Sequence, residues 1–99
     1  MLVIRVDKTE YFEKWFRKLK DRQTKTIIVT HIKRMEMGNL GVVRSVGQGV
    51  YEKKINHAGG FRLYYIQRGE TWILLLCGGD KSTQQADIKL AHELKKGLK

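Results

Sequence analysis

Residues 50–84 read VYEKKINHAGGFRLYYIQRGETWILLLCGGDKSTQ, and this stretch decides the fold. Turns that contain glycine divide it into three extended segments, Val50–Asn56, Phe61–Gln67 and Thr71–Cys77. The third segment holds an unbroken apolar run that is too short to cross a membrane. A short apolar run bounded by turn residues is typical of a strand buried on both faces. We therefore expect this strand at the centre of a sheet.

The N-terminal part of the chain predicts a strand followed by a helix. Leu2–Val6 is rich in branched residues and predicts the strand. Asp7 is a candidate N-cap, with Glu10 three residues further on. Aromatic and apolar residues recur at i, i+3, i+4 and i+7 and predict an amphipathic helix over Thr9–Lys20: Phe12, Trp15, Phe16 and Leu19. This stripe fits a core-facing side, with base stacking as the alternative.

The segment Gln23–Met37 carries two conflicting signals. Thr26–Thr30 is β-branched and locally favours a strand. Helical spacing and a glycine at the expected C-cap, Gly38, favour a helix with Ile28, Ile32 and Met35 on its apolar side. We predict a helix, which would pack with the preceding one as a helical hairpin on one face of the sheet.

The remaining segments complete an α+β domain. Val42–Val46 predicts a short strand, and Gln84–Leu98 a final helix with candidate caps at Asp80, Ser82 and Thr83. Short loops between consecutive strands predict antiparallel neighbours. The expected fold is an N-terminal strand, a helical hairpin, an antiparallel sheet of about four to five strands and a C-terminal helix. All of it fits one domain over residues 1–99.

Charge is the strongest compositional signal. Twenty Lys and Arg against ten Asp and Glu give a formal net charge of +10, which favours a polyanionic partner such as nucleic acid or a ribosome surface. A solvated basic surface without a specific partner is the alternative. The chain has no candidate membrane span or signal peptide, so we expect a cytoplasmic protein.

Cysteine and histidine usage argues against disulfide and metal chemistry. The single Cys77 lies in the apolar run and is expected to be a buried thiol. The three histidines are scattered and lack a second ligand type at metal-binding spacing. We predict no metal site and no cofactor.

Strand alternation predicts where chemistry could take place. If the strands at 50–56 and 61–67 pair, Glu52, Lys54, Arg62 and Tyr64 share one exposed face, and Lys81 can reach toward it. Cations bind phosphate, aromatic rings stack bases, and a carboxylate or phenol can move a proton. RNA can be cut without a metal when its 2′-hydroxyl attacks the neighbouring phosphate and cations stabilise the developing charge. The alternative is a set of solvated charges on an open sheet face.

Four short motifs follow one another along the chain. They are GNxG at 38–41, VGxGVYE at 46–52, GFRxYY at 60–65 and LLLxGGDKSTQ at 74–84. With these motifs the chain resembles the RelE/ParE toxin superfamily, and more closely its HigB-like branch of phage-derived addiction module killer proteins. The resemblance covers nearly the whole chain, and the GGDKSTQ block is its most specific part.

The resemblance implies a function and a partner. It implies the toxin of a type II toxin–antitoxin system, neutralised by a small antitoxin of the helix-turn-helix HigA-like kind. It further implies metal-independent cleavage of mRNA, usually on the ribosome, with inhibition of translation. Two alternatives stay open: a ParE-like inhibitor of DNA gyrase without nuclease activity, and a non-catalytic RNA- or ribosome-binding module.

The resemblance also suggests roles for single residues. Arg62 falls on the arginine of the family's Gly-(Phe/Tyr)-Arg motif and would stabilise the phosphate, and Lys54 and Lys81 match basic positions. Glu52 and Tyr64 are candidates for proton transfer. Arg44 and His57 are added as RNA-binding candidates, and His57 also as an acid–base participant. The chain departs from the family pattern at Lys53, where the branch usually has an apolar residue, at Val42, which replaces a commonly acidic residue, and at Gly59, which replaces a common proline. Its tail also lacks the tyrosine or histidine that some members use.

Overall fold

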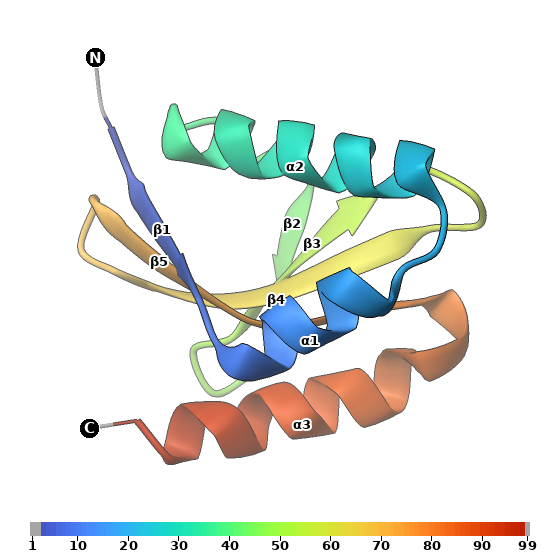
Figure 1. Ribbon diagram of the computed structural model, residues 1–99. Coiled ribbons are helices and arrows are strands. Elements are labelled where there is room, and N and C mark those ends of the chain that lie inside the picture. Colours follow the sequence, from blue (N-terminus) through green and yellow to red (C-terminus); the bar gives the residue numbers. More distant parts are fainter. Residues whose placement is uncertain (1–2, 99) are drawn as a thin grey trace.

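The computed structural model describes residues 3–98 and shows one five-stranded sheet between helices (Figure 1). The strand order is β1-β5-β4-β3-β2, with β1 parallel to β5 and all other neighbours antiparallel. This confirms the predicted α+β fold. No helix within residues 3–98 has the length and apolar character that a membrane span requires. The strands are β1 (Arg5–Lys8), β2 (Val43–Ser45), β3 (Tyr51–Ile55), β4 (Phe61–Arg68) and β5 (Trp72–Asp80), and the helices are α1 (Glu10–Lys18), α2 (Arg22–Glu36), the 3₁₀ turn η1 (Lys81–Thr83) and α3 (Gln84–Lys96).

The apolar run forms β5, an interior strand buried on both faces, as predicted. Two details of the prediction were wrong. The middle strand of the sheet is β4, because β1 adds outside β5. In addition, β5 does not end at Cys77 but continues through Gly78 and Gly79 to Asp80, since these residues still pair with β4.

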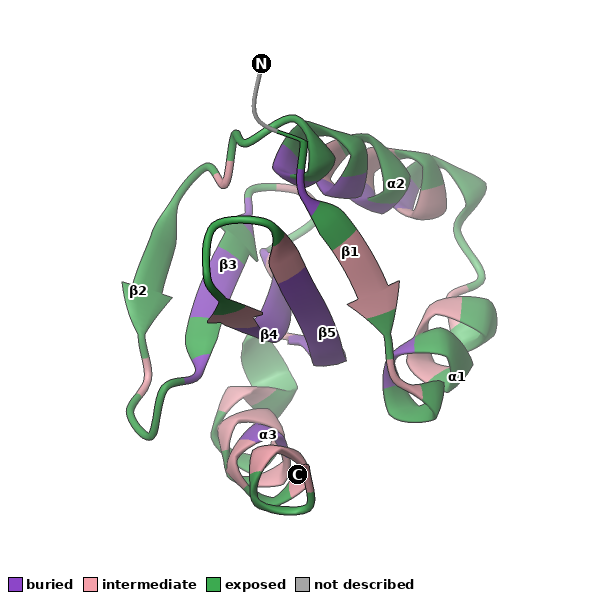
Figure 2. Cartoon of the chain, turned by 90° about the vertical axis from the view of Figure 1, so that its left-hand side faces the viewer, coloured by how far each residue is buried: buried purple, intermediate pink, exposed green. Residues whose placement is uncertain are grey.

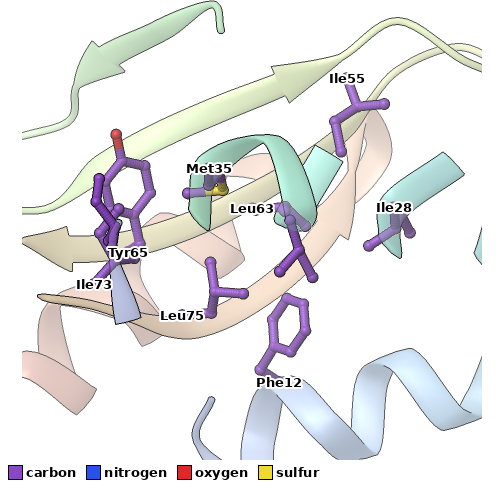
Figure 3. Close-up of a cluster of buried hydrophobic side chains, with 10 residues drawn as sticks. Phe12, Ile28, Met35, Ile55, Leu63, Tyr65, Ile73 and Leu75 are labelled. Atoms are coloured by element: carbon purple, nitrogen blue, oxygen red, sulfur yellow. The ribbon is translucent and has the colours of Figure 1, made fainter. Parts of the chain in front are cut away.

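One face of the sheet packs against α1 and α2. Figure 3 shows the ring of Phe12 from α1 pointing toward Leu63 and Leu75 of the sheet. The helical reading of the ambiguous segment is confirmed, because its predicted apolar positions are buried in this cluster: Ile28, Ile32 and Met35. Both helices thus cover the same face, as expected of the predicted hairpin.

The other face of the sheet is not open, which corrects the prediction. Helix α3 covers β4 and β5 there and closes a second apolar cluster that contains Tyr64, Ile66, Leu76 and Ala91. Figure 2 shows that every residue of β2 is exposed and that β3 has both exposed and buried residues, whereas β5 is largely buried. Only the end of the sheet near β2 and β3 therefore stays accessible on the α3 side.

The N-cap of α1 is Thr9 and not the predicted Asp7. Thr9 Oγ1 accepts a hydrogen bond from Phe12 N at 3.1 Å and donates one to Leu76 O at 2.6 Å. Asp7 still belongs to β1, and its carboxylate accepts a 2.8 Å hydrogen bond from the Trp72 indole. The predicted start of the first strand, Leu2, lies outside the described residues. Helix α1 ends at Lys18, two residues earlier than predicted, because Leu19 already has an extended backbone.

The paired glycines of β5 allow a helix to approach from each side. A Cβ at Gly78 would overlap the indole of Trp15 on α1. A Cβ at Gly79 would overlap the carboxylate of Asp87 on α3. Both glycines are thus needed for packing, and the second one lets the start of α3 lie against the sheet beside Arg62, which pairs with Gly79.

We predict that Gly78→Ala destabilises the fold by about 1–3 kcal/mol, because the added methyl group would displace a partly buried indole. Chemical denaturation measures this loss. Gly97→Ala is the matched control, since its Cβ would lie 3.6 Å from Leu94 O in ordinary contact and the backbone φ is −77°. Equal stability of Gly78→Ala and Gly97→Ala would contradict this account of the packing.

Candidate active site

A buried carboxylate organises the accessible end of the α3-facing side. Cross-strand pairing places Arg44, Glu52 and Tyr64 in one row across β2, β3 and β4. The next row on the same face pairs Lys54 with Arg62. We define the Glu52 cluster as the carboxylate and the four side chains that surround it: Glu52, Arg44, Arg62, Tyr64 and Gln84.

Glu52 is 4% exposed and accepts hydrogen bonds at both carboxylate oxygens. Oε1 accepts from Arg44 Nε at 2.7 Å. Oε2 accepts from Tyr64 OH at 3.0 Å and from Gln84 Nε2 at 2.9 Å. Arg62 Nε lies 3.8 Å from the same Oε2 atom, an ion-pair distance rather than a hydrogen bond. Glu52 therefore ties β2, β4 and the first residue of α3 together.

These contacts oppose proton transfer by the two residues predicted for it. Burial by itself raises the pKa of Glu52, but hydrogen bonds from Arg44, Gln84 and Tyr64 outweigh it and leave the pKa below its ordinary value. Burial raises the pKa of Tyr64 well above its ordinary range, and its hydrogen bond to Glu52 adds to this shift. Glu52 thus stays an acceptor and Tyr64 a donor to it. The geometry favours a positioning role for both.

Arg62 is the member of the cluster whose buried donors lack hydrogen-bond partners in the described part of the chain. Its side chain is only 8% exposed, and neither Nε nor Nη1 has a hydrogen-bond partner among residues 3–98. An unsatisfied buried donor costs about 1–3 kcal/mol, more when it is charged. Such a guanidinium, fixed by Glu52 but not saturated by it, is suited to bind an anion through two parallel N–H donors.

A cavity of about 270 Å³ lies next to this guanidinium. Its charged lining consists of three cations, Arg44, Lys54 and Arg62, against the single carboxylate of Glu52. Lys54 is exposed, whereas Arg62 is buried, so the two cations lie at the rim and at the base of the same cavity. The structure thus brings together five sequence-predicted site residues: Arg44, Glu52, Lys54, Arg62 and Tyr64.

Lys81 lies beside this group but in a different depression. It is exposed on η1 and lines a shallow cavity of about 440 Å³ with Gly60 and Asp80. Gly60 also lies close to two side chains of the first cavity, because a Cβ there would lie 3.4 Å from Arg62 Nη1 and 3.9 Å from Lys54 Cε. Gly60 therefore separates the depression that Lys81 lines from the side chains of Arg62 and Lys54.

The structure does not bring His57 to this site. Its ring stacks on Phe61 on the α1–α2 side of the sheet, with ring centroids 6.2 Å apart. Nε2 lies 3.0 Å from Thr24 Oγ1 and 3.9 Å from Asp21 Oδ2, at the start of α2. In this place His57 connects the β3–β4 turn to a helix N-terminus, and it faces away from Arg62.

Gln84 is a residue of the site that no sequence pattern identified beforehand. The GGDKSTQ block explains its placement. The Asp80 carboxylate accepts from Ser82 N at 2.9 Å, and Asp80 N donates to Thr83 Oγ1 at 3.3 Å. This capping box turns the chain so that the next side chain reaches Glu52. The sequence does show a polar residue, Gln84, directly after a capping box. That this residue binds Glu52 is seen only in the tertiary structure.

Residues 3–98 contain no group of three or more His, Cys, Asp or Glu side chains arranged to hold a metal ion. Cys77 is buried, and burial raises the pKa of its thiol to about 12. Its Sγ donates a 3.6 Å hydrogen bond to Asp87 O. The thiol is thus a packing group of the second apolar cluster rather than a nucleophile.

Comparison with known proteins defines the family. The model of the family described as phage-derived protein Gp49-like matches residues 14–96. The chain belongs to the Gp49-like family. An uncharacterized protein of Haemophilus influenzae is 40% identical over 97 residues, which cover 98% of each chain.

Solved structures share the fold at low sequence identity. An arginine double mutant of the E. coli toxin RelE in the free state matches with a TM-score of 0.67 and 18% identity, covering 99% of this chain and 100% of that one. A chain of the intact E. coli RelBE toxin–antitoxin complex matches with a TM-score of 0.58 and 19% identity, covering 79% of this Gp49-like chain and 95% of that one. The RelE-like fold and the phage-derived family that the sequence motifs implied are thereby confirmed.

We predict that Glu52→Gln lowers the free energy of unfolding by about 2 kcal/mol at pH 7, because charge-assisted hydrogen bonds become neutral ones. The folded-state pKa of Glu52 is lowered, so its carboxylate stabilises the fold above the unfolded pKa, and this stabilisation is lost as the pH falls through the folded pKa. The wild-type advantage over the variant should therefore disappear on acidification. Denaturation at several pH values measures this, with Glu70→Gln, an exposed turn residue, as control. A pH-independent difference would contradict this assignment.

Proposed function

We propose that this protein is the toxin of a type II toxin–antitoxin pair and cleaves mRNA without a metal ion. The observation that carries the proposal is the buried Arg62 guanidinium, with two donor atoms unused, at the base of a cationic cavity. The net charge of +10 supports a polyanionic ligand. The family match and the RelE-like fold support the toxin class.

In the proposed reaction the 2′-oxygen of a ribose attacks the adjacent phosphorus, and the bond to the 5′-oxygen of the next nucleotide breaks. Arg62 binds the non-bridging oxygens, where negative charge develops in the transition state. The proton of the 2′-hydroxyl passes to water, and the Lys54 ammonium protonates the leaving 5′-oxygen. The products are a 2′,3′-cyclic phosphate and a free 5′-hydroxyl.

Glu52, Tyr64 and Gln84 act through Arg62 in this proposal. Their hydrogen-bond network fixes the carboxylate, and the carboxylate lies 3.8 Å from Arg62 Nε. The guanidinium is thus held in place before the phosphate arrives, which makes electrostatic stabilisation effective. Arg44 and Lys81 would contact the flanking nucleotides from the edges of the site.

The proposed partners are a cognate antitoxin and the translating ribosome in the cytoplasm. Similarity to a chain of the RelBE toxin–antitoxin complex supports an antitoxin, and a helix-turn-helix protein of the HigA-like kind is the proposed form. The ribosome is proposed because a basic protein with a shallow cavity of about 270 Å³ offers few contacts of its own to position a long RNA.

Arg62→Ala should abolish growth inhibition, with a loss of cleavage rate of at least about 100-fold, because the main donor to the transition state is removed. Mapping of mRNA 5′ ends after induction measures cleavage within open reading frames. Arg62→Lys keeps the charge but loses the two-pronged donor geometry, so we expect it to be severely impaired as well.

The control for this experiment is Lys14→Gln, which removes an exposed cation of α1 and should leave toxicity unchanged. A folded Arg62→Ala protein that still cuts mRNA would refute the proposed chemistry. Growth arrest with intact mRNA and induced DNA damage would instead identify a gyrase inhibitor. Binding of RNA without any cleavage by the wild type would identify a non-catalytic binding module.

A further inference from the structure

A second cationic cavity lies between α2 and the end of β3. It has a volume of about 220 Å³. Arg34 of α2 and Lys53 and Lys54 of β3 form its charged lining, and His31 of α2 adds an imidazole. Asn39 and Asn56 add neutral polar groups, and no carboxylate contributes to the lining. A polar cavity that gathers positive charge without a counter-ion favours an anionic ligand.

Lys53 is the most unusual residue of this cavity because it is 1% exposed. Its ammonium donates one hydrogen bond, to Leu40 O at 2.7 Å, and forms no ion pair with any carboxylate of residues 3–98. Burial lowers its pKa, and the charge of Arg34 lowers it further. Two donors of a buried ammonium are thus left for a ligand, and an anion would offset the cost of the buried charge.

His31 adds a second unused donor or acceptor. Its Nδ1 atom is buried and has no hydrogen-bond partner in the described part of the chain. Burial lowers the pKa of His31, and the charges of Lys53 and Arg34 add to the effect. An anion between these groups would offset the positive charges of Lys53 and Arg34 and would accept a hydrogen bond from the ring.

A glycine lies directly against the ammonium and leaves room for it. Gly41 has a φ of +73°, and a Cβ at this position would lie 2.5 Å from Lys53 Nζ. The next residue, Val42, lines both this cavity and the one that holds Arg62, and so does Lys54. Val42 O accepts a 3.0 Å hydrogen bond from Lys54 N, so these two residues form the edge between the two cavities. The two cavities are therefore neighbours around one accessible sheet edge.

We propose that the cavity of His31, Arg34 and Lys53 binds a second phosphate of the RNA strand whose scissile phosphate lies at Arg62. This inference rests on the proposed function, because it assumes that the strand enters the Arg62 cavity. A ribose-phosphate chain carries one anionic group per nucleotide, so a strand that crosses the Lys54–Val42 edge presents a further phosphate to the second cavity. The second contact fixes the direction in which the strand passes Arg62.

Titration of the purified protein with inorganic phosphate tests the anion site separately from catalysis. Phosphate should shift the NMR signals of the His31 ring and of the Gly41 amide. We expect Lys53→Met, which preserves the side-chain length, to weaken this response at least about tenfold. Arg34 is exposed, so Arg34→Gln tests the same site if Lys53→Met does not fold. Lys14→Gln, with the same loss of one charge, should behave as the wild type.

Binding of a single-stranded RNA to the Arg62→Ala protein tests the role in RNA recognition. Arg34→Gln removes one phosphate contact, so the slope of the logarithm of the RNA association constant against the logarithm of the salt concentration should fall in magnitude by about 0.7. Lys14→Gln removes no contact and should leave the slope unchanged. A phosphate response at His31 without RNA cleavage by the wild type would refute the proposed nuclease but support the anion site. Three results would overturn this inference. The first is RNA cleavage by a wild type whose His31 signals do not respond to phosphate. The others are an equal change of the salt slope in Arg34→Gln and Lys14→Gln, and binding of an acidic peptide but not of phosphate.

Discussion

The site depends on one buried carboxylate, Glu52, which accepts hydrogen bonds from side chains of several elements at the same time. Glu52 receives hydrogen bonds from β2 through Arg44, from β4 through Tyr64 and from α3 through Gln84. These contacts leave Arg62 near the carboxylate without a hydrogen bond to it. A half-satisfied cation next to a fully satisfied anion is stable in the folded protein, yet it retains affinity for a further anion.

The packing of α3 explains why this arrangement is rigid. The helix can approach the sheet because Gly79 has no side chain, and the capping box at Asp80 sets its starting direction. Its first residue then reaches Glu52, while Ala91 and its apolar neighbours close the cluster around Tyr64. The same helix that buries the apolar half of this face therefore completes the polar half. Side chains held in this way need little rearrangement when a ligand binds.

Two cationic cavities lie next to each other at one sheet edge and share Val42 and Lys54 in their linings. They concentrate part of the positive charge at defined positions of the surface. The lining of the first includes Arg62, which has two buried donor atoms without partners among the described residues, and that of the second includes Lys53, whose buried ammonium makes one hydrogen bond. Exposed lysines elsewhere contribute to the long-range field but are screened by salt. The distinction matters for function, since buried and geometrically fixed cations select a phosphate, whereas solvated ones only attract a polyanion.

Much of this architecture was determined by the sequence itself. Apolar periodicity identified the buried strand β5 and the core positions of α2, and the short loops implied antiparallel neighbours, because burial and chain geometry act over a few residues. Strand alternation placed Glu52, Lys54, Arg62 and Tyr64 on one face. Only the tertiary structure decided how they are used. It placed α3 over the face that alternation left open, moved His57 to the other side of the sheet and brought Gln84 to Glu52 across 32 positions of the chain. It also gathered Lys53 and His31, which local patterns cannot relate, because their proximity depends on how a helix packs against a distant strand.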